Sequence, residues 1–512
     1  MKSRALLILG SALLPLLHGA EWSKLTSPNF ELYTTSGERE GRQTLETFEQ
    51  VRDFFARVKK TDVTTRLPVT IVAFGSQREY KPYGMSEFAP AYSVADEQHD
   101  YIVMSDLGND RTLAAIHEYV HVLVRHSGLK MPLWLNEGLA DVYSTMQARD
   151  GQIVVGSIPK GRAYSLTQEN WMRLGSLVRV GPTSSEYNEQ DRASIFYAQS
   201  WLLAHMLMLG DGYADKFSTF VNVLSASGSS QVAFSDVYGK TLPEIEKEMN
   251  AYFRQSTIGG VAYNTGFQKV EVGKAQSPTE LEIDLTLAKL VELLGRSQEA
   301  EKRMEQLAAT HRDAYEVDEA LAYLEWRKGD RAAAVRHFQL ALAHGATSWK
   351  TYWDYARSLA SGEGDREPLL PTLRKTLELK PDLTDARLLL GQELHRTHQY
   401  AEALAELRQI KSVDPERAAV MYLAMAHLAL ELKQESDARQ YAEEAKKYAQ
   451  EPNEVSGAEK LLEYLQQNNA SARDATSTTA VPPASELVDD PGRPTLRHRG
   501  SQSPAPKAPP RK

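Results

Sequence analysis

From about residue 281 onward, the chain repeats one pattern of small and large apolar residues at intervals of about 34 residues. Small residues recur in pairs with a constant spacing: Ala288 with Ala300, Ala322 with Ala334, Gly391 with Ala403, and Ala426 with Ala438. Small residues let two helices approach closely, while leucine and aromatic side chains fill the seam between them. The pattern therefore predicts a stack of helix-turn-helix units.

One of these units shows the small and large positions most clearly: Leu390, Gly391, Leu394, Ala403, Leu407, Ile410 and Pro415. A less regular unit covers residues 350–383, around Trp353 and Pro381, and residues 363–368 are predicted to form a loop inside it. The pattern resembles tetratricopeptide repeats, about five of them over residues 281–452, with a further helix to about residue 467. The resemblance implies an all-α solenoid at residues 281–467 that binds a protein or peptide partner.

The front of the chain has a different pattern. Strand-forming residues and buried apolar runs predict strands at residues 29–35, 67–74 and 100–105. Residues 41–58 carry apolar side chains at helical spacing, and further helices follow from the segment around His117 to about residue 254. Strands followed by helices predict an α+β domain at residues 21–257, and the turn-forming residues of 258–280 predict a linker with room for one short strand.

The two ends of the chain predict export and a tail. Lys2 and Arg4 precede an apolar run at residues 5–17 that is too short for a comfortable membrane span. This predicts a signal peptide at residues 1–20 and a periplasmic or extracellular protein. His18 does not fit the small-residue rule at the cleavage site, and an uncleaved membrane anchor is the alternative. Residues 468–512 lack apolar periodicity and predict a disordered tail.

Composition narrows the chemistry that the chain can perform. The sequence has no cysteine, so an exported form has no disulfides, and any metal site must use histidine and carboxylate ligands. The formal net charge of −9 gives no sign of the basic face that nucleic-acid binding requires. We therefore expect no nucleic-acid partner.

The segment His-Glu-Tyr-Val-His at residues 117–121 offers two metal ligands. On a helix, His117 and His121 lie on the same face, so both imidazoles point to one place. Two such imidazoles are suited to Zn²⁺, and Glu118 would act as the general base toward an activated water. The alternative interpretation is a helix that carries two unrelated histidines in the core or in solvent.

A second predicted helix supplies the remaining parts of the site. Pro132 suits its first turn, and Gly128 suits a tight reversal that brings the two helices face to face. Glu137 and Asp141 lie four residues apart on one face of this helix. Glu137 can supply the third ligand, and Asp141 can accept the distal N–H of His117.

Together these segments resemble the gluzincin metallopeptidases, the thermolysin-like group with His-Glu-x-x-His on one helix and Asn-Glu-x-x-x-Asp on the next. The chain looks like exported peptidase MA-like domains fused to tetratricopeptide repeats. The resemblance implies a zincin-like catalytic domain with Zn²⁺ as cofactor, His117, His121 and Glu137 as metal ligands, Glu118 as catalytic base, and Asp141 as the outer partner of His117.

A zinc peptidase also needs a donor for the negatively charged oxygen that forms during hydrolysis. Gluzincins commonly take it from a downstream helix, and Tyr197 is the candidate, with an ordinary core tyrosine as the alternative interpretation. Tyr143, His126 and His205 are lesser candidates.

The sequence thus predicts an exported zinc-dependent peptidase that hydrolyses peptide or protein substrates, with a repeat domain for a protein partner. Contact with a membrane is expected only if the signal segment stays uncleaved. A non-catalytic envelope scaffold with a structural or vestigial metal site is the alternative, and hydrolysis of a non-peptide amide is a third option.

Overall fold

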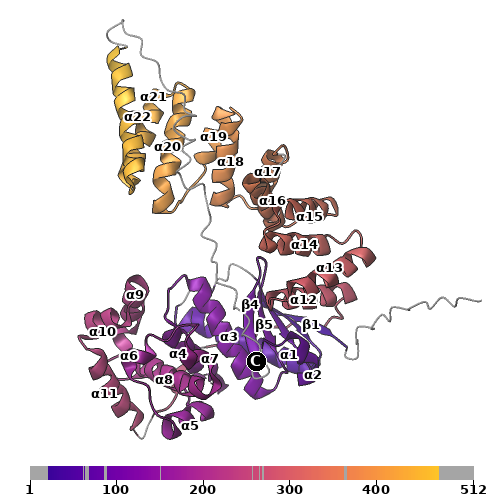
Figure 1. Ribbon diagram of the computed structural model, residues 1–512, viewed down its shortest axis with the longest axis vertical. Helices are drawn as coiled ribbons and strands as arrows, with labels where there is room; N and C mark the ends of the chain where they lie inside the picture. The colour runs from indigo at the N-terminus through magenta and orange to yellow at the C-terminus, as the bar shows by residue number, and fades with distance from the viewer. Residues whose placement is uncertain are drawn as a thin grey trace, which may run out of the picture. The chain divides into compact units, whose positions relative to one another are not determined.

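The computed structural model describes residues 21–471, except 61–62, 64–67, 86–88, 150–151, 256–257, 265, 268–269 and 363–365. The chain forms two compact units, of which the first ends at Leu294 and the second begins at Gly295 (Figure 1). The predicted signal peptide and residues 472–512 of the predicted tail lie outside the described residues. Within the described part of the chain, no helix has the length and hydropathy of a membrane span.

The first unit is built on a five-stranded sheet with the order β1-β2-β3-β5-β4. Its strands are β1 (Ser23–Thr26), β2 (Phe30–Thr34), β3 (Val69–Ala73), β4 (Ala91–Ala95) and β5 (Asp100–Met104). The three central strands are parallel, while β1 and β4 pair antiparallel at the two edges. The predicted strands correspond to β2, β3 and β5, and both edge strands are additions to the prediction. A smaller sheet joins β6 (Gln147–Arg149), β7 (Gln152–Val155) and β8 (Val261–Asn264) in that order, so the predicted linker contributes one strand.

Helices make up most of the rest of this unit. They are α1 (Glu38–Asp53), α2 (Gln77–Tyr80), α3 (Asn109–Ser127), α4 (Leu133–Ser144), α5 (Lys160–Gln168), α6 (Leu174–Leu177), α7 (Ser185–Asn188), α8 (Gln190–Leu209), α9 (Phe217–Ser227), α10 (Ser230–Tyr238), α11 (Leu242–Phe253) and α12 (Glu280–Leu293). Three short segments complete the set: a π-helical turn, η1 (Phe54–Val58), and the 3₁₀ turns η2 (Lys81–Tyr83) and η3 (Ala214–Lys216).

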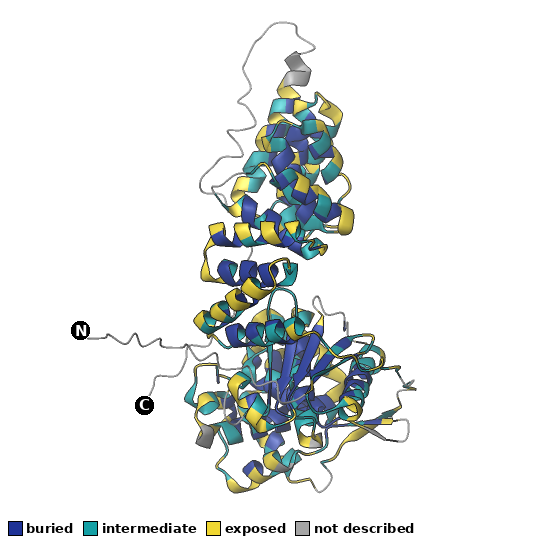
Figure 2. Ribbon diagram, turned by 90° about the vertical axis from the view of Figure 1, so that its right-hand side faces the viewer, coloured by how far each residue is buried: buried dark blue, intermediate teal, exposed yellow. Residues whose placement is uncertain are grey.

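The large sheet is covered on both faces, and its central strands β2, β3 and β5 are almost entirely buried, as the dark blue strands of Figure 2 show. Side chains such as Leu32 and Ile102 join the main core with α1 and α3, whereas Val72 and Val103 face the other way. Strand residues alternate between the faces, so two separate covers are needed. Leu290 of α12 is fully buried in the second cluster. The helix predicted to open the repeat region therefore packs within the first unit.

The second unit is all-helical in its described residues, as the repeat pattern predicts. It contains α13 (Ser297–Thr310), α14 (Tyr315–Lys328), α15 (Arg331–Ala343), α16 (Trp349–Ser361), α17 (Leu369–Leu379), α18 (Thr384–Arg396), α19 (Tyr400–Leu407), α20 (Pro415–Glu431), α21 (Glu435–Tyr448) and α22 (Pro452–Ser471), which stack in succession (Figure 1). Gly391 shows why a small residue is needed, because a Cβ there would lie 2.7 Å from the Leu407 side chain.

Candidate metal centre

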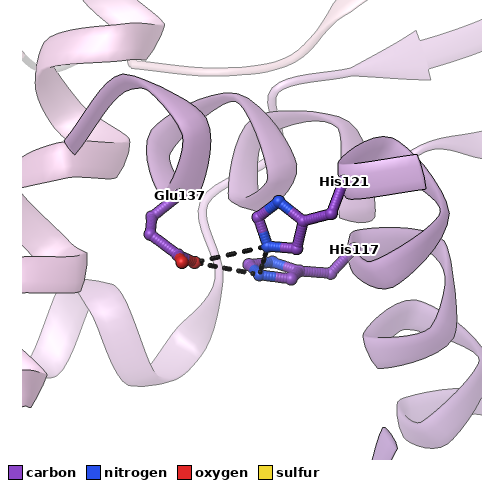
Figure 3. Close-up of side chains that lie close together, drawn as sticks. All are labelled: His117, His121 and Glu137. Atoms are coloured by element: carbon purple, nitrogen blue, oxygen red, sulfur yellow. Dashed lines mark hydrogen bonds and ion pairs between the residues drawn. The ribbon is translucent and has the colours of Figure 1, made fainter. Parts of the chain in front are cut away.

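Two facing helices carry the three predicted ligands. Buried Ile116 and Val120 seat α3 in the core, which leaves His117 and His121 one turn apart on its partly exposed side. Gly128 then ends α3 with a φ of 72°, a left-handed conformation that glycine adopts without strain, and the chain reverses into α4. Glu137 of α4 points at both imidazoles (Figure 3).

The distances among the three ligand atoms fit one small cation. His117 Nε2 lies 3.1 Å from His121 Nε2 and 3.2 Å from Glu137 Oε2, and His121 Nε2 lies 3.5 Å from that same oxygen. In a tetrahedral zinc site with bonds of about 2.0–2.1 Å, ligand atoms stand about 3.3 Å apart. The structure thus brings His117, His121 and Glu137 together at the spacing that zinc coordination needs.

Outer hydrogen bonds orient the two imidazoles for this purpose. His117 Nδ1 lies 3.0 Å from Asp141 Oδ1, and His121 Nδ1 lies 3.2 Å from Asn136 Oδ1. Both oxygens are acceptors, so each Nδ1 donates to its partner, and the two Nε2 atoms face each other and Glu137. When both imidazoles are neutral, two Nε2 lone pairs and a carboxylate oxygen converge on one place, where they could hold a metal ion.

The acidic side chains around the two histidines favour positive charge in the site. Burial alone would lower the pKa of His117, but its hydrogen bonds to Asp141 and Glu137 outweigh burial and raise the pKa to about 10. Burial opposes ionisation of Glu137, yet the hydrogen bonds with His117 and His121 hold the pKa of its carboxyl below the usual range. The side chains of both histidines keep 16% exposure, so an ion and water can reach the site from solvent.

Asp141 has a second partner that the sequence did not reveal. Arg162 of α5 reaches it with two nitrogens, Nε at 2.6 Å from Oδ2 and Nη2 at 3.2 Å from Oδ1. Burial opposes the ionised form of Asp141, but the positive charge of Arg162 and the bond to His117 lower the pKa of the carboxyl. Because Asp141 stays charged, it holds His117 in one tautomer and orientation. Arg162 lies far from the motif along the chain, so no sequence pattern predicted its contact with Asp141.

Two tyrosine side chains lie close to the predicted ligands. Tyr187 of α7 donates a hydrogen bond to Glu137 Oε1 at 3.2 Å, and it is hydrogen-bonded to Tyr197 of α8. The Arg162 guanidinium lies 4.8 Å from the centre of the Tyr197 ring. Burial and the negative charge of Glu137 raise the pKa of both phenols, so each keeps its proton as a donor. Tyr197 was predicted, whereas Tyr187 was missed because no periodic pattern surrounds it.

Glu118, the residue after His117 on α3, contacts the edge strand β4. Its Oε2 accepts a hydrogen bond from the Ser93 hydroxyl at 2.9 Å. Glu118 and Ser93 are both partly exposed. The candidate base is therefore hydrogen-bonded to the outermost strand of the large sheet.

The lesser candidates have other partners. His126 and Arg125 pair with the fully buried Asp100, at 2.5 and 2.7 Å, and tie α3 to β5. Tyr143 packs against the Phe55 ring at 4.7 Å between ring centres. His205 is buried and lies 2.9 Å from the carbonyl of Gly156. These contacts give the three residues roles in packing.

Among known proteins, the chain is similar to solved structures of repeat proteins. No protein-family model and no curated protein matches the chain. A solved structure of YrrB, described as a TPR protein with an unusual peptide-binding site, is similar over 35% of this chain and 90% of its own, at 18% identity and a TM-score of 0.31. A structure of the MamA protein is similar over 39% of this chain and 98% of its own, at 12% identity and a TM-score of 0.29.

Proposed function

We propose that the first unit is a zinc-dependent peptidase with His117, His121 and Glu137 as the metal ligands. The observation that carries this proposal is the mutual spacing of the three ligand atoms, 3.1, 3.2 and 3.5 Å, close to that of a tetrahedral zinc site. Three protein ligands leave one position open, the arrangement of catalytic zinc sites, whereas structural sites use four protein ligands.

The chemistry divides among the surrounding residues. Bound zinc supplies Lewis acidity, which makes a water molecule more acidic and polarises a carbonyl group. Glu118 accepts a proton from the attacking water and passes it to the leaving amine. Tyr197, protonated at neutral pH, donates to the carbonyl oxygen as negative charge develops there. Asp141 and Arg162 hold the His117 imidazole in one orientation.

The edge strand favours an extended peptide as the substrate. In the described part of the chain, β4 pairs with β5 alone, so its outer edge can accept another strand. Because Ser93 of β4 contacts Glu118, a peptide added to this edge would lie beside the candidate base. Backbone hydrogen bonds of this kind bind many sequences, so we expect broad specificity from this contact.

The second unit and the predicted export signal complete the proposal. A stack of helix pairs offers an extended surface, and we infer that it binds a protein or peptide partner. From the predicted signal peptide we infer that the protein works in the periplasm or outside the cell.

Metal analysis combined with peptide digestion tests the proposal. We expect one zinc per chain and cleavage of a broad peptide library by the parent protein. Glu118→Gln should keep the zinc and lose cleavage, while Asp110→Asn, which changes an exposed carboxyl on the same helix, should behave like the parent. A chain without zinc would contradict the proposal. Zinc without cleavage of peptides or other amides would support the non-catalytic scaffold instead.

A further inference from the structure

Strand β4 presents one polar side chain to the face of the sheet that carries α3. Ala91 belongs to the core beneath α3, whereas Tyr92 belongs to the cluster on the opposite face. Because side chains alternate along a strand, Ser93 shares the face of Ala91. The register that pairs Ser93 with Ile102 places it on the edge strand beside a fully buried residue of β5.

At that position the Ser93 hydroxyl meets the candidate base. Its Oγ lies 2.9 Å from Glu118 Oε2, a normal length for a hydroxyl donating to a carboxylate. The bond occupies one of the two carboxylate oxygens and leaves the other, Oε1, for proton transfer. We propose that Ser93 is a positioning residue that fixes the Glu118 carboxylate for proton transfer, an inference that rests on the proposed peptidase function.

The physical need for such a bond follows from the flexibility of glutamate. Glu118 is partly exposed on α3, and a free glutamate side chain distributes over many rotamers. A base acts efficiently only when it stands within hydrogen-bond reach of the proton that it removes. A donor on the adjacent, hydrogen-bonded strand selects one rotamer without adding a competing charge.

A purely structural role for the same bond would have a different signature. If the Ser93–Glu118 bond served only to tie β4 to α3, its loss would lower stability and leave the chemical step unchanged. Ser27 offers a matched control, because its hydroxyl also donates to a glutamate, Glu49, at 2.7 Å, and links the turn before β2 to α1.

The test compares Ser93→Ala, Ser93→Thr and Ser27→Ala in the full chain loaded with zinc. For Ser93→Ala we expect kcat to fall roughly 10-fold to 100-fold with KM and zinc content unchanged, because only the orientation of the base is lost. Ser93→Thr, which keeps a hydroxyl, should recover most of kcat. Ser27→Ala should keep the kcat of the parent.

A binding measurement supplies a readout independent of turnover. A dipeptidyl hydroxamate engages both a zinc ion and a neighbouring carboxylate, whereas a dipeptidyl thiol engages the metal alone. Ser93→Ala should weaken calorimetric binding of the hydroxamate about 10-fold and leave that of the thiol unchanged. If Ser93→Ala keeps the parent's kcat and hydroxamate affinity while Glu118→Gln is inactive, the role of Ser93 is overturned and the peptidase stands. A parent protein that binds neither inhibitor overturns both.

Discussion

Gly138 of α4 lies directly against the backbone carbonyl of Ser200 in α8. A Cβ at Gly138 would overlap that carbonyl oxygen and stand 2.8 Å from the Cβ of Ala204. Glu137 precedes Gly138, and Tyr197 lies on the same helix as Ser200, one turn earlier. A single close approach of two helices thus sets the position of a candidate metal ligand relative to the candidate oxyanion donor.

Gly138→Ala should therefore damage both stability and metal binding. Added volume in a packed contact costs about 1–3 kcal/mol and shifts the backbone, and the shift would displace Glu137. Urea unfolding and a zinc competition assay would measure the two effects. Gly161→Ala is the matched control, because Gly161 is exposed on α5 with open space around it, and alanine there should stabilise by up to about 1 kcal/mol. Equal stability of the two variants would contradict the packing argument.

Asp141→Asn should weaken zinc binding without removing any ligand. The amide can still accept from His117, but it no longer carries the charge that pairs with Arg162 and stabilises the imidazole orientation. Loss of such an outer partner typically costs about 10-fold to 100-fold in metal affinity. Competition with a fluorescent chelator measures the change, and Asp215→Asn, an exposed position in η3, is the control. An unchanged zinc affinity in Asp141→Asn would show that the charge of Asp141 does not contribute to metal binding.

Replacement of Tyr197 and of Tyr187 by phenylalanine should have different effects on catalysis and on zinc binding. Tyr197→Phe should lower kcat by about 10²-fold to 10³-fold with zinc affinity unchanged, because it removes a donor needed during reaction. Tyr187→Phe removes the hydrogen bond to Glu137 and should lower zinc affinity by a few fold. Steady-state kinetics at saturating zinc distinguishes the two effects. The reverse pattern would assign the donor role to Tyr187.

The cluster of His117, His121 and Glu137 was predictable from sequence because helical spacing is local. The interval of four residues fixes His117 and His121 on one face whatever surrounds them, and Gly128 forces the reversal that brings Glu137 opposite. Arg162, Tyr187 and Ser93 reach the site through tertiary packing of separate elements. No interval along the chain encodes those contacts, so only the folded structure shows them.

The fold prediction also succeeded for local patterns and failed for tertiary packing. Strands β2, β3 and β5 are rich in strand-forming residues and almost entirely buried, and they stood out in the sequence. The edge strands β1 and β4 carry fewer buried residues and gave a weaker signal. Helix α12 matches the repeat pattern through Ala288, yet its leucines pack on the sheet of the first unit. Repeat periodicity identifies a helix but does not determine what it packs against.

His205 predicts how stability depends on pH. The imidazole is almost completely buried, with Nε2 against the Gly156 carbonyl and Nδ1 2.8 Å from the Tyr252 hydroxyl. Burial lowers the pKa of His205, and hydrogen bonds to backbone carbonyls only partly oppose this. Below the unfolded pKa of about 6.5, the unfolded chain binds a proton at His205 that the folded chain does not. The free energy of unfolding therefore decreases as the pH is lowered from about 6.5 to the pKa of His205 in the folded chain.

We expect this group to cost up to about 1.4 kcal/mol for each pH unit below about 6.5. Urea unfolding at several pH values between 5 and 8 would show a shallower acid loss in His205→Gln than in the parent. The exposed His311→Gln serves as the control and should follow the parent curve. Parallel curves for His205→Gln and the parent would contradict the assignment.

Helix α12 should stabilise the first unit although its sequence belongs to the repeat pattern. Leu290 is fully buried in a cluster that includes Tyr92 and Val103. On the same helix, Glu282 forms a 2.6 Å ion pair with Lys24 of β1. Leu290→Ala should cost about 2–5 kcal/mol, because it leaves a cavity against the sheet. Leu379→Ala, at a side chain with 39% exposure, should cost much less. If thermal unfolding shows the first unit unaffected by Leu290→Ala, α12 is only loosely attached to the sheet.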